Sequence, residues 1–142
     1  MVASNTKKVV IVTGANSGIG RGVAIAFALQ GCAVVINFPS DNKEEEASEV
    51  GNLIGQTGGE AVIVKGDVSV ESEVKEMVET VQQRYGRVDV LINNAGIAKP
   101  SLIEDTTLSD WERTVDVHLK GTFLCTREVL PYMYAKNTGR II

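Results

Sequence analysis

With 142 residues, 44% of them apolar and 23% charged, the chain has the size and composition of one globular domain with a buried core. Its formal net charge of −4 and pI near 5.0 argue against a nucleic-acid-binding protein, because contacts to phosphates need a basic face. One histidine and two distant cysteines predict no metal site, and the longest apolar runs are too short to span a membrane.

Two strand–helix units open the chain. The apolar run 9–12 is typical of a short strand that is buried on both faces of a parallel sheet. Apolar residues at helical spacing follow over 20–30. A second buried strand is predicted over 33–36, and a helix with an acidic face over 43–56.

Two further units follow. A strand is predicted over 61–64, and an amphipathic helix then begins with Ser69 as its expected cap. The run 88–92 predicts the fourth strand. A long helix is expected over 109–136, with a bend at Pro131.

Residues 139–142 resemble a turn and the first residues of a fifth strand. The alternation of strands and helices predicts an α/β fold, a Rossmann-type doubly wound parallel sheet with right-handed crossovers. We expect one domain over 1–142, with strands in the order 3-2-1-4 and the start of strand 5. The sheet is therefore expected to be incomplete at its C-terminal end.

A glycine-rich turn joins the first strand to the first helix. Its three glycines, Gly14, Gly18 and Gly20, suit a sharp turn that lets a diphosphate approach the backbone and packs the helix close to the sheet. The helix that follows offers free N–H groups and a partial positive charge. Because a strand precedes the turn and a helix follows it, the context predicts nucleotide binding.

The Gly-x-x-x-Gly-x-Gly spacing, together with Asn-Asn-Ala-Gly at 93–96, resembles the short-chain dehydrogenase/reductase family. The resemblance covers essentially the whole chain, including Asp67-Val68 and residues 111–121. It is strongest toward 3-oxoacyl-thioester reductases and glucose dehydrogenases. It implies hydride transfer between NAD(P) and a carbonyl/alcohol pair.

The resemblance also implies roles for single residues. Asp67 would contact the adenine amine, although it is also a plausible helix cap. Residues 93–96 would line the cofactor, while Asn93 and Asn94 could equally pin the end of the strand. The predicted cofactor-binding residues are Gly14, Asn16, Ser17, Gly18, Ile19, Gly20, Phe38, Ser40, Asp67, Val68, Asn93, Ala95 and Gly96.

The end of the second strand bears on the choice of cofactor. Phe38 stands where NAD-specific relatives place an acid, so no carboxylate there repels a 2′-phosphate. The arginine that often clamps this phosphate is missing too, since Pro39 and Ser17 take its two usual positions. We predict NADP over NAD by a modest margin. Candidate phosphate ligands are Ser40, Asn42, Lys43 and Arg21.

His118 stands where the family has an asparagine. It could hold a water molecule for a proton relay, as that asparagine is thought to do. The alternative is a buried histidine that is hydrogen-bonded to backbone. Helical spacing places its imidazole toward the sheet, on one face with Trp111, Val115 and Thr122.

The family's other catalytic groups, a serine and a Tyr-x-x-x-Lys motif after the fifth strand, are absent from the sequence. Tyr132 precedes Lys136 by four residues but lies in the long helix, so this match is interpreted as coincidental. We expect the chain alone to be inactive and to be a shortened version of a longer enzyme. The alternative is a non-catalytic nucleotide-binding or interaction module. Residues 93–96 disfavour an unrelated Rossmann binder of flavin or adenosylmethionine.

The remaining expectations concern association and surroundings. Strand 88–92 would nearly be a sheet edge, which predicts an unstable chain that associates through it. Full-length relatives commonly pair through the long helix, so a homo-oligomer is expected of a complete form. Cys32 and Cys125 match no motif, and we expect reduced thiols in a cytoplasmic protein.

Overall fold

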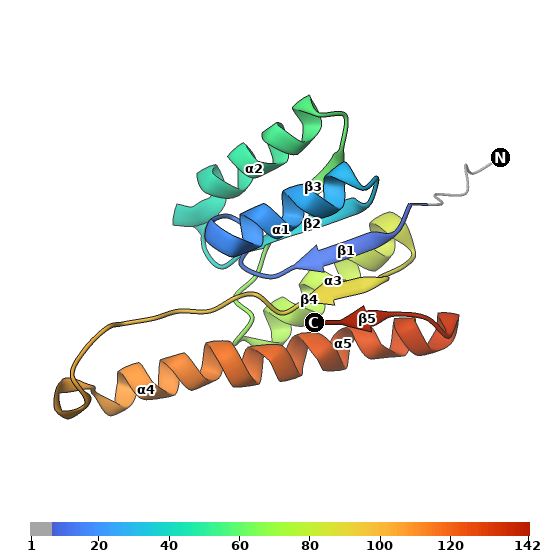
Figure 1. Cartoon of the computed structure of the whole chain (residues 1–142). Coiled ribbons are helices and arrows are strands. Elements are labelled where there is room, and N and C mark those ends of the chain that lie inside the picture. The colour runs from blue at the N-terminus through green and yellow to red at the C-terminus, as the bar shows by residue number, and fades with distance from the viewer. Residues whose placement is uncertain (1–6) are drawn as a thin grey trace.

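A computed structural model describes residues 7–142 and contains a parallel five-stranded sheet (Figure 1). Its strand order, β3-β2-β1-β4-β5, confirms the expected Rossmann-type α/β topology. The apolar runs predicted the strands because a strand covered on both faces needs no polar side. The strands are β1 (Val9–Val12), β2 (Ala33–Phe38), β3 (Glu60–Lys65), β4 (Val90–Ile92) and β5 (Arg140–Ile141).

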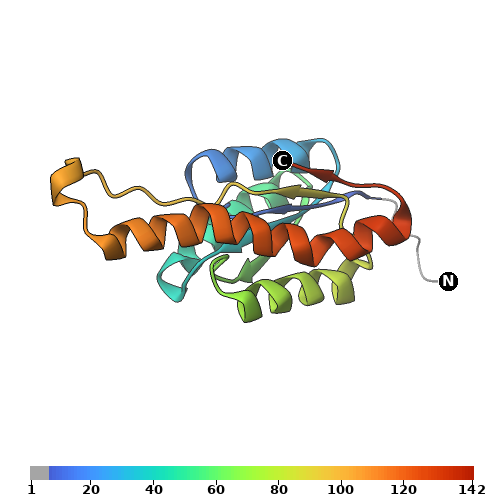
Figure 2. The same cartoon turned by 90° about the horizontal axis from the view of Figure 1, so that it is seen from below.

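Helices cover both faces of the sheet, as Figures 1 and 2 show. Helices α1 and α2 pack on one face, and α3 and α5 on the other. No helix within residues 7–142 combines the length and apolar character needed to cross a membrane. The helices are α1 (Gly18–Leu29), α2 (Glu44–Gln56), α3 (Glu71–Tyr85), α4 (Leu108–Val115) and α5 (Gly121–Lys136).

The core is divided by the sheet into two clusters. In β1, Val9 and Ile11 face α3 and α5, whereas Val10 and Val12 face α1 and α2. All four are fully buried. Because the paired strands all run parallel, their carboxyl ends, and the loops that follow them, lie on one side of the molecule.

The expected exposed edge at strand 4 is wrong. β4 pairs with β1 on one side and with β5 on the other. The Arg140 N–H donates to Asp89 O (2.9 Å), and the Ile142 N–H donates to Leu91 O (3.0 Å). Residues 140–142 are enough to pair with the backbone of β4, because that strand is only three residues long. The association expected through strand 4 therefore loses its structural basis.

The long helix is interrupted, though not at Pro131. A π-helical segment, η3 (Asp116–Lys120), separates α4 from α5. Helix α5 runs through Pro131, which has no N–H and leaves the Arg127 carbonyl without its usual helix partner. The structure places the irregularity around His118, where it inserts extra backbone into the turn.

The expected helix cap at Ser69 is wrong as well. Helix α3 begins at Glu71 with Val70 as its N-cap residue, and Val70 has no side-chain oxygen to offer. The Ser69 hydroxyl instead donates to Asp67 Oδ1 (2.6 Å). The Ser69 hydroxyl is thus bonded to the Asp67 side chain within a local turn and does not cap the helix.

Candidate functional site

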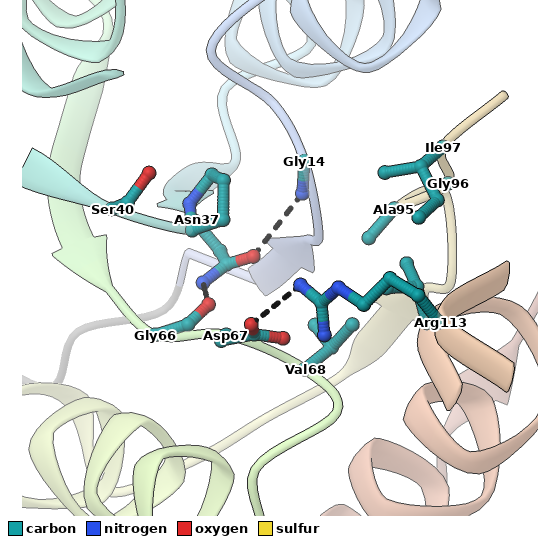
Figure 3. Close-up of a pocket in the computed structure, with 12 residues that line it drawn as sticks. Gly14, Asn37, Ser40, Gly66, Asp67, Val68, Ala95, Gly96, Ile97 and Arg113 are labelled. Atoms are coloured by element: carbon teal, nitrogen blue, oxygen red, sulfur yellow. Dashed lines mark hydrogen bonds and ion pairs between the residues drawn. The ribbon is translucent and has the colours of Figure 1, made fainter. Parts of the chain in front are cut away.

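A cavity of about 250 Å³ lies where the carboxyl ends of β1, β2, β3 and β4 meet (Figure 3). In open parallel sheets this end, at the point where strand order reverses, is where ligands bind. Six predicted residues line it: Gly14, Ser40, Asp67, Val68, Ala95 and Gly96. Six others were not predicted: Asn37, Pro39, Gly66, Ile97, Arg113 and Val117.

The glycine turn has the geometry that a bound diphosphate requires. Gly14 and Gly18 have φ of +62° and +55°, in the left-handed region that side chains disfavour. A Cβ at Gly18 would meet nothing within 4 Å, so the backbone there faces open space. A Cβ at Gly20 would lie 2.4 Å from Asn94 Nδ2 and 2.5 Å from Gly14 O. Gly20 is thus required because the helix packs tightly on the turn, and Gly18 leaves its backbone open to a ligand.

The amino end of α1 is prepared for an anion. In the described part of the chain, no side chain caps this helix, whose N-cap residue is Ser17. Its first turn has no acidic residue. The first N–H with a backbone partner is that of Arg21, which donates to Ser17 O (3.1 Å). The N–H groups of residues 18–20 are therefore available beside the open backbone at Gly18, and they suit a phosphate.

Asn37 holds the cavity wall together from inside β2. It is 1% exposed. Its Oδ1 accepts from the Gly14 N–H (3.1 Å), and its Nδ2 donates to Gly66 O (2.9 Å) and Val64 O (3.3 Å). One buried amide thus ties the glycine turn to the end of β3. A polar residue at the end of an otherwise apolar run was the available signal, but the predicted strand stopped one residue earlier.

Asn94 pins the glycine turn from the other side. Its Nδ2 donates to Thr13 O (2.9 Å) and Gly14 O (3.2 Å). The Asn94 N–H and the Ala95 N–H both donate to Thr13 Oγ1, at 3.0 and 2.9 Å. The structural interpretation of the Asn-Asn pair is therefore confirmed for Asn94. The side chain positions the turn, and Ala95 lines the cavity.

Asp67 is the carboxylate on the cavity wall. Its Oδ1 accepts from the N–H (2.9 Å) and hydroxyl (2.6 Å) of Ser69, and its Oδ2 accepts from Arg113 (2.7 Å). Burial opposes ionisation, but the hydrogen bonds from Ser69 and Arg113 outweigh it and hold the pKa of Asp67 below its ordinary value. The helix-cap interpretation of Asp67 is wrong, because α3 starts four residues later.

His118 is exposed rather than buried, but it does bond backbone. Its Nε2 lies 2.9 Å from Ile97 O and 3.1 Å from Ile97 N. The ring packs against Gly96, where a Cβ would lie 2.6 Å from His118 Cε1. The expected sheet-facing stripe is also wrong, since Trp111 is 62% exposed. The π-helical segment adds a residue to the turn and breaks the 3.6-residue register.

Several predicted residues do not line the cavity. Phe38 is 3% exposed and packs into the core beneath α1 and α2. The Asn16 side chain points to α2, where Nδ2 donates to Glu46 Oε2 (2.7 Å). Ser17 and Ile19 are exposed on α1. Asn93 lies beside a smaller pocket, and its N–H donates to Ile142 O (2.7 Å).

Three of the four candidate phosphate ligands, Ser40, Asn42 and Lys43, are engaged with neighbours. Lys43 pairs with Glu46 Oε1 (2.7 Å), the same carboxylate that holds Asn16. The Ser40 hydroxyl donates to Asn42 Oδ1 (2.6 Å) at the cavity rim. The Lys43 and Asn16 hydrogen bonds lower the pKa of Glu46.

Tyr132 and Lys136 lie at the far end of the sheet. Both belong to the C-terminal part of α5, next to the turn into β5 (Figure 1). Lys136 is close enough to Asp89, which precedes β4, to lower the pKa of that carboxyl. The cavity is at the opposite ends of the strands, so Tyr132 and Lys136 lie away from it, as the interpretation of a coincidental match predicts.

The sequence profile of the family described as short chain dehydrogenase matches residues 8–142. A 3-oxoacyl-[acyl-carrier-protein] reductase from Synechocystis sp. is 39% identical over 137 residues, which make up 96% of this chain and 55% of that protein. The chain spans about half the length of this curated relative.

Proposed function

The chain belongs to the short-chain dehydrogenase family, and from this premise we propose that it binds NADP for hydride transfer to or from a carbonyl or alcohol carbon. The observation that carries the proposal is the uncapped amino end of α1. Its free N–H groups stand beside the left-handed, open Gly18, and the same turn reaches the cavity through Gly14. When bound, the nicotinamide of such a cofactor supplies or accepts the hydride.

The chain's own residues would bind and orient the nucleotide. The N–H groups of residues 18–20 would hold the diphosphate against the helix dipole. Asp67 would accept from the adenine amine, and Val68, Ala95 and Gly96 would enclose the adenosine. Asn37 and Asn94 would keep the glycine turn in place through their hydrogen bonds to Thr13 and Gly14. These residues pre-order the site, which reduces the entropy that binding costs.

His118 is the one candidate for proton movement among these residues. Its Nε2 is held by the backbone of Ile97, and its own carbonyl accepts from Thr122 Oγ1 (2.7 Å). The ring therefore orients the segment behind Gly96. The proton-relay role expected from the family's asparagine remains a proposal for this position.

A preference for NADP over NAD rests on the end of β2. Phe38 is buried, and the cavity rim that follows carries Pro39 and Ser40 instead of a carboxylate. Lys43, now paired with Glu46, is the cation closest in sequence to that rim. The expected preference is modest, because Glu46 competes for Lys43. The Synechocystis relative is a 3-oxoacyl-[acyl-carrier-protein] reductase, which supports a 3-oxoacyl group as the carbonyl substrate of the complete enzyme.

Titration calorimetry on the 142-residue chain tests the proposal. NADP is expected to bind more tightly than NAD, whereas FAD and S-adenosylmethionine should give no heat. Tighter binding of NAD would overturn the cofactor preference, and absence of binding by both would overturn the function. Turnover of a 3-oxoacyl thioester by this chain would overturn the non-catalytic alternative.

We also propose self-association and a cytoplasmic setting. Apolar side chains gather on the outer face of α4 and α5, where Leu108, Trp111, Leu119 and Phe123 are between 57% and 70% exposed. Such a patch supports pairing of two copies through the long helix. Burial raises the pKa of Cys125 to about 12, which leaves an inert thiol suited to a reducing compartment. Sedimentation velocity would test the pairing.

A further inference from the structure

Arg113 extends from α4 across the cavity mouth to the turn between β3 and α3 (Figure 3). One of its nitrogens donates to Asp67 Oδ2 (2.7 Å), and another donates to the Ser69 hydroxyl. The guanidinium thus joins two polar groups that are 46 and 44 residues away in the sequence.

The contacts around Asp67 use most of what its carboxylate can accept. A carboxylate has about four acceptor positions on its two oxygens. Ser69 fills two positions on Oδ1, and Arg113 fills one on Oδ2. One position on Oδ2 therefore remains for a donor in the cavity. Neighbouring Glu73 does not compete, because its carboxylate accepts from the Asp67 N–H (2.7 Å).

We propose that Arg113 is a positioning residue for base recognition, which fixes the Asp67 carboxylate so that its remaining acceptor selects a purine carrying a 6-amino group. The inference rests on the proposed dinucleotide binding. A 6-amino group donates to that acceptor, whereas a 6-oxo group would place its lone pairs against the carboxylate. Adenine is thus favoured over hypoxanthine or guanine.

Arg113 matters because it donates to both Ser69 and Asp67, which form the turn that would contact the base. Without Arg113, the Ser69 hydroxyl and Asp67 Oδ2 each lose an accepted hydrogen bond, so both side chains gain rotational freedom. Water would then solvate the freed oxygen and must be displaced by the base. Affinity for an adenine dinucleotide falls, while an analogue that never used this acceptor is little affected.

The chain provides a matched control in Arg127. Arg127 is 43% exposed, close to the 47% of Arg113, and also joins the long helix to the start of α3 by pairing with Glu71. It does not line the cavity. Arg127→Met therefore removes an ion pair of comparable exposure between α5 and α3, and it leaves the turn at residues 67–69 untouched.

The experiment measures the dissociation constants of NADP and its hypoxanthine analogue, nicotinamide hypoxanthine dinucleotide phosphate, by calorimetry. The wild-type chain should prefer the adenine form by about tenfold, the difference expected of a hydrogen bond to a charged group. Arg113→Met should weaken NADP about tenfold and leave the analogue within about twofold, so the preference disappears. Arg113→Lys, which keeps one donor, should restore part of it. Arg127→Met should keep the full preference.

Each other outcome is decisive. If Arg113→Met binds NADP with the wild-type preference, the positioning role is wrong while the proposed function stands. If both Arg113→Met and Arg127→Met lose the preference, a general loosening of the helix pair is responsible and the role is wrong. If the wild-type chain binds neither dinucleotide, the proposed function fails and takes this inference with it.

Discussion

Two arginine–aspartate pairs stand at opposite ends of the sheet. At the amino end, Arg87 binds Asp89 through two hydrogen bonds of 2.7 and 2.6 Å, and Asp89 also accepts from the Val9 N–H (2.8 Å). At the carboxyl end, Arg113 binds Asp67 through one hydrogen bond. The Asp89 side chain is 8% exposed and the Asp67 side chain 21%.

The difference between the pairs lies in their surroundings, because each carboxylate accepts three hydrogen bonds. Asp89 accepts from Arg87 and from the β1 backbone, so its contacts all contribute to folding. Asp67 accepts from Ser69 and Arg113 and also lines the cavity. The same pair of side chains thus locks the sheet at one end and prepares a site at the other, in line with ligand binding at the carboxyl ends of parallel strands.

The sharpest way to break this comparison is to remove each carboxylate. Asp89→Ala should lower the free energy of unfolding by about 3 kcal/mol, because it strands a partly buried guanidinium and the Val9 N–H. Asp67→Ala should cost only about 1 kcal/mol, since its ion pair is more exposed. Urea unfolding followed by circular dichroism measures both. Equal losses would show that the two ends do not differ as described.

The glycine turn gives the next largest effect. Gly20→Ala should cost about 2 kcal/mol and weaken dinucleotide binding at least tenfold, because the new Cβ collides with Asn94 and with the Gly14 carbonyl. Gly22→Ala is the control on the same helix. Its Cβ would meet nothing within 4 Å, so it should stabilise the chain by about 0.5–1 kcal/mol through helix propensity. Calorimetry that finds normal dinucleotide binding in Gly20→Ala would contradict the proposal that the glycine turn holds the diphosphate.

These contrasts also show how far the sequence could lead. Buried parallel strands are continuous apolar runs, so the sheet order and the strand–helix units were predictable and are confirmed. The family resemblance, carried by the glycine spacing and by residues 93–96, is confirmed by the profile match. Residue spacing along one element therefore identified both the fold and the turn.

Contacts between distant elements could not be predicted in the same way. Arg113 meets Asp67 across 46 residues, and nothing in either segment's pattern signals it. Phe38 and Asn37 alternate in β2, and a strand end misplaced by two residues was enough to hide which of them faces the cavity. The predicted direction of the His118 side chain assumed a regular helix of 3.6 residues per turn. The π-helical segment has a different period, so side chains along it do not fall on the expected face.

Acid titration tests the two aspartates in a smaller energy range. Burial opposes the ionisation of Asp89, but the hydrogen bonds from Arg87 and Val9 outweigh it and hold its pKa below the ordinary value, as for Asp67. Because both folded pKa values lie below the unfolded value of about 4, the unfolded chain binds more protons in acid. The stabilisation is present above that unfolded value and is lost as the pH falls through the folded values.

Asp89→Asn should therefore flatten the acid limb of the stability profile by about 1 kcal/mol between pH 5 and pH 2, and more than Asp67→Asn does. The larger effect is expected for Asp89 because its contacts are all internal. Urea unfolding at each pH provides the measurement. A wild-type chain that gained stability on acidification, or a larger flattening in Asp67→Asn, would reverse the ranking of the two ends.

The smallest effect is expected at His118, also at the carboxyl end. One imidazole nitrogen faces both the N–H and the carbonyl of Ile97, and it can donate to one or accept from the other but never do both. An asparagine amide carries a donor and an acceptor side by side, so His118→Asn should satisfy both groups and stabilise the chain by about 0.5–1 kcal/mol. Hydrogen exchange at the Ile97 amide should slow accordingly. Unchanged or faster exchange would mean that the imidazole already satisfies the Ile97 backbone as well as an amide would. The unsatisfied group inferred at this end of the sheet would then not exist.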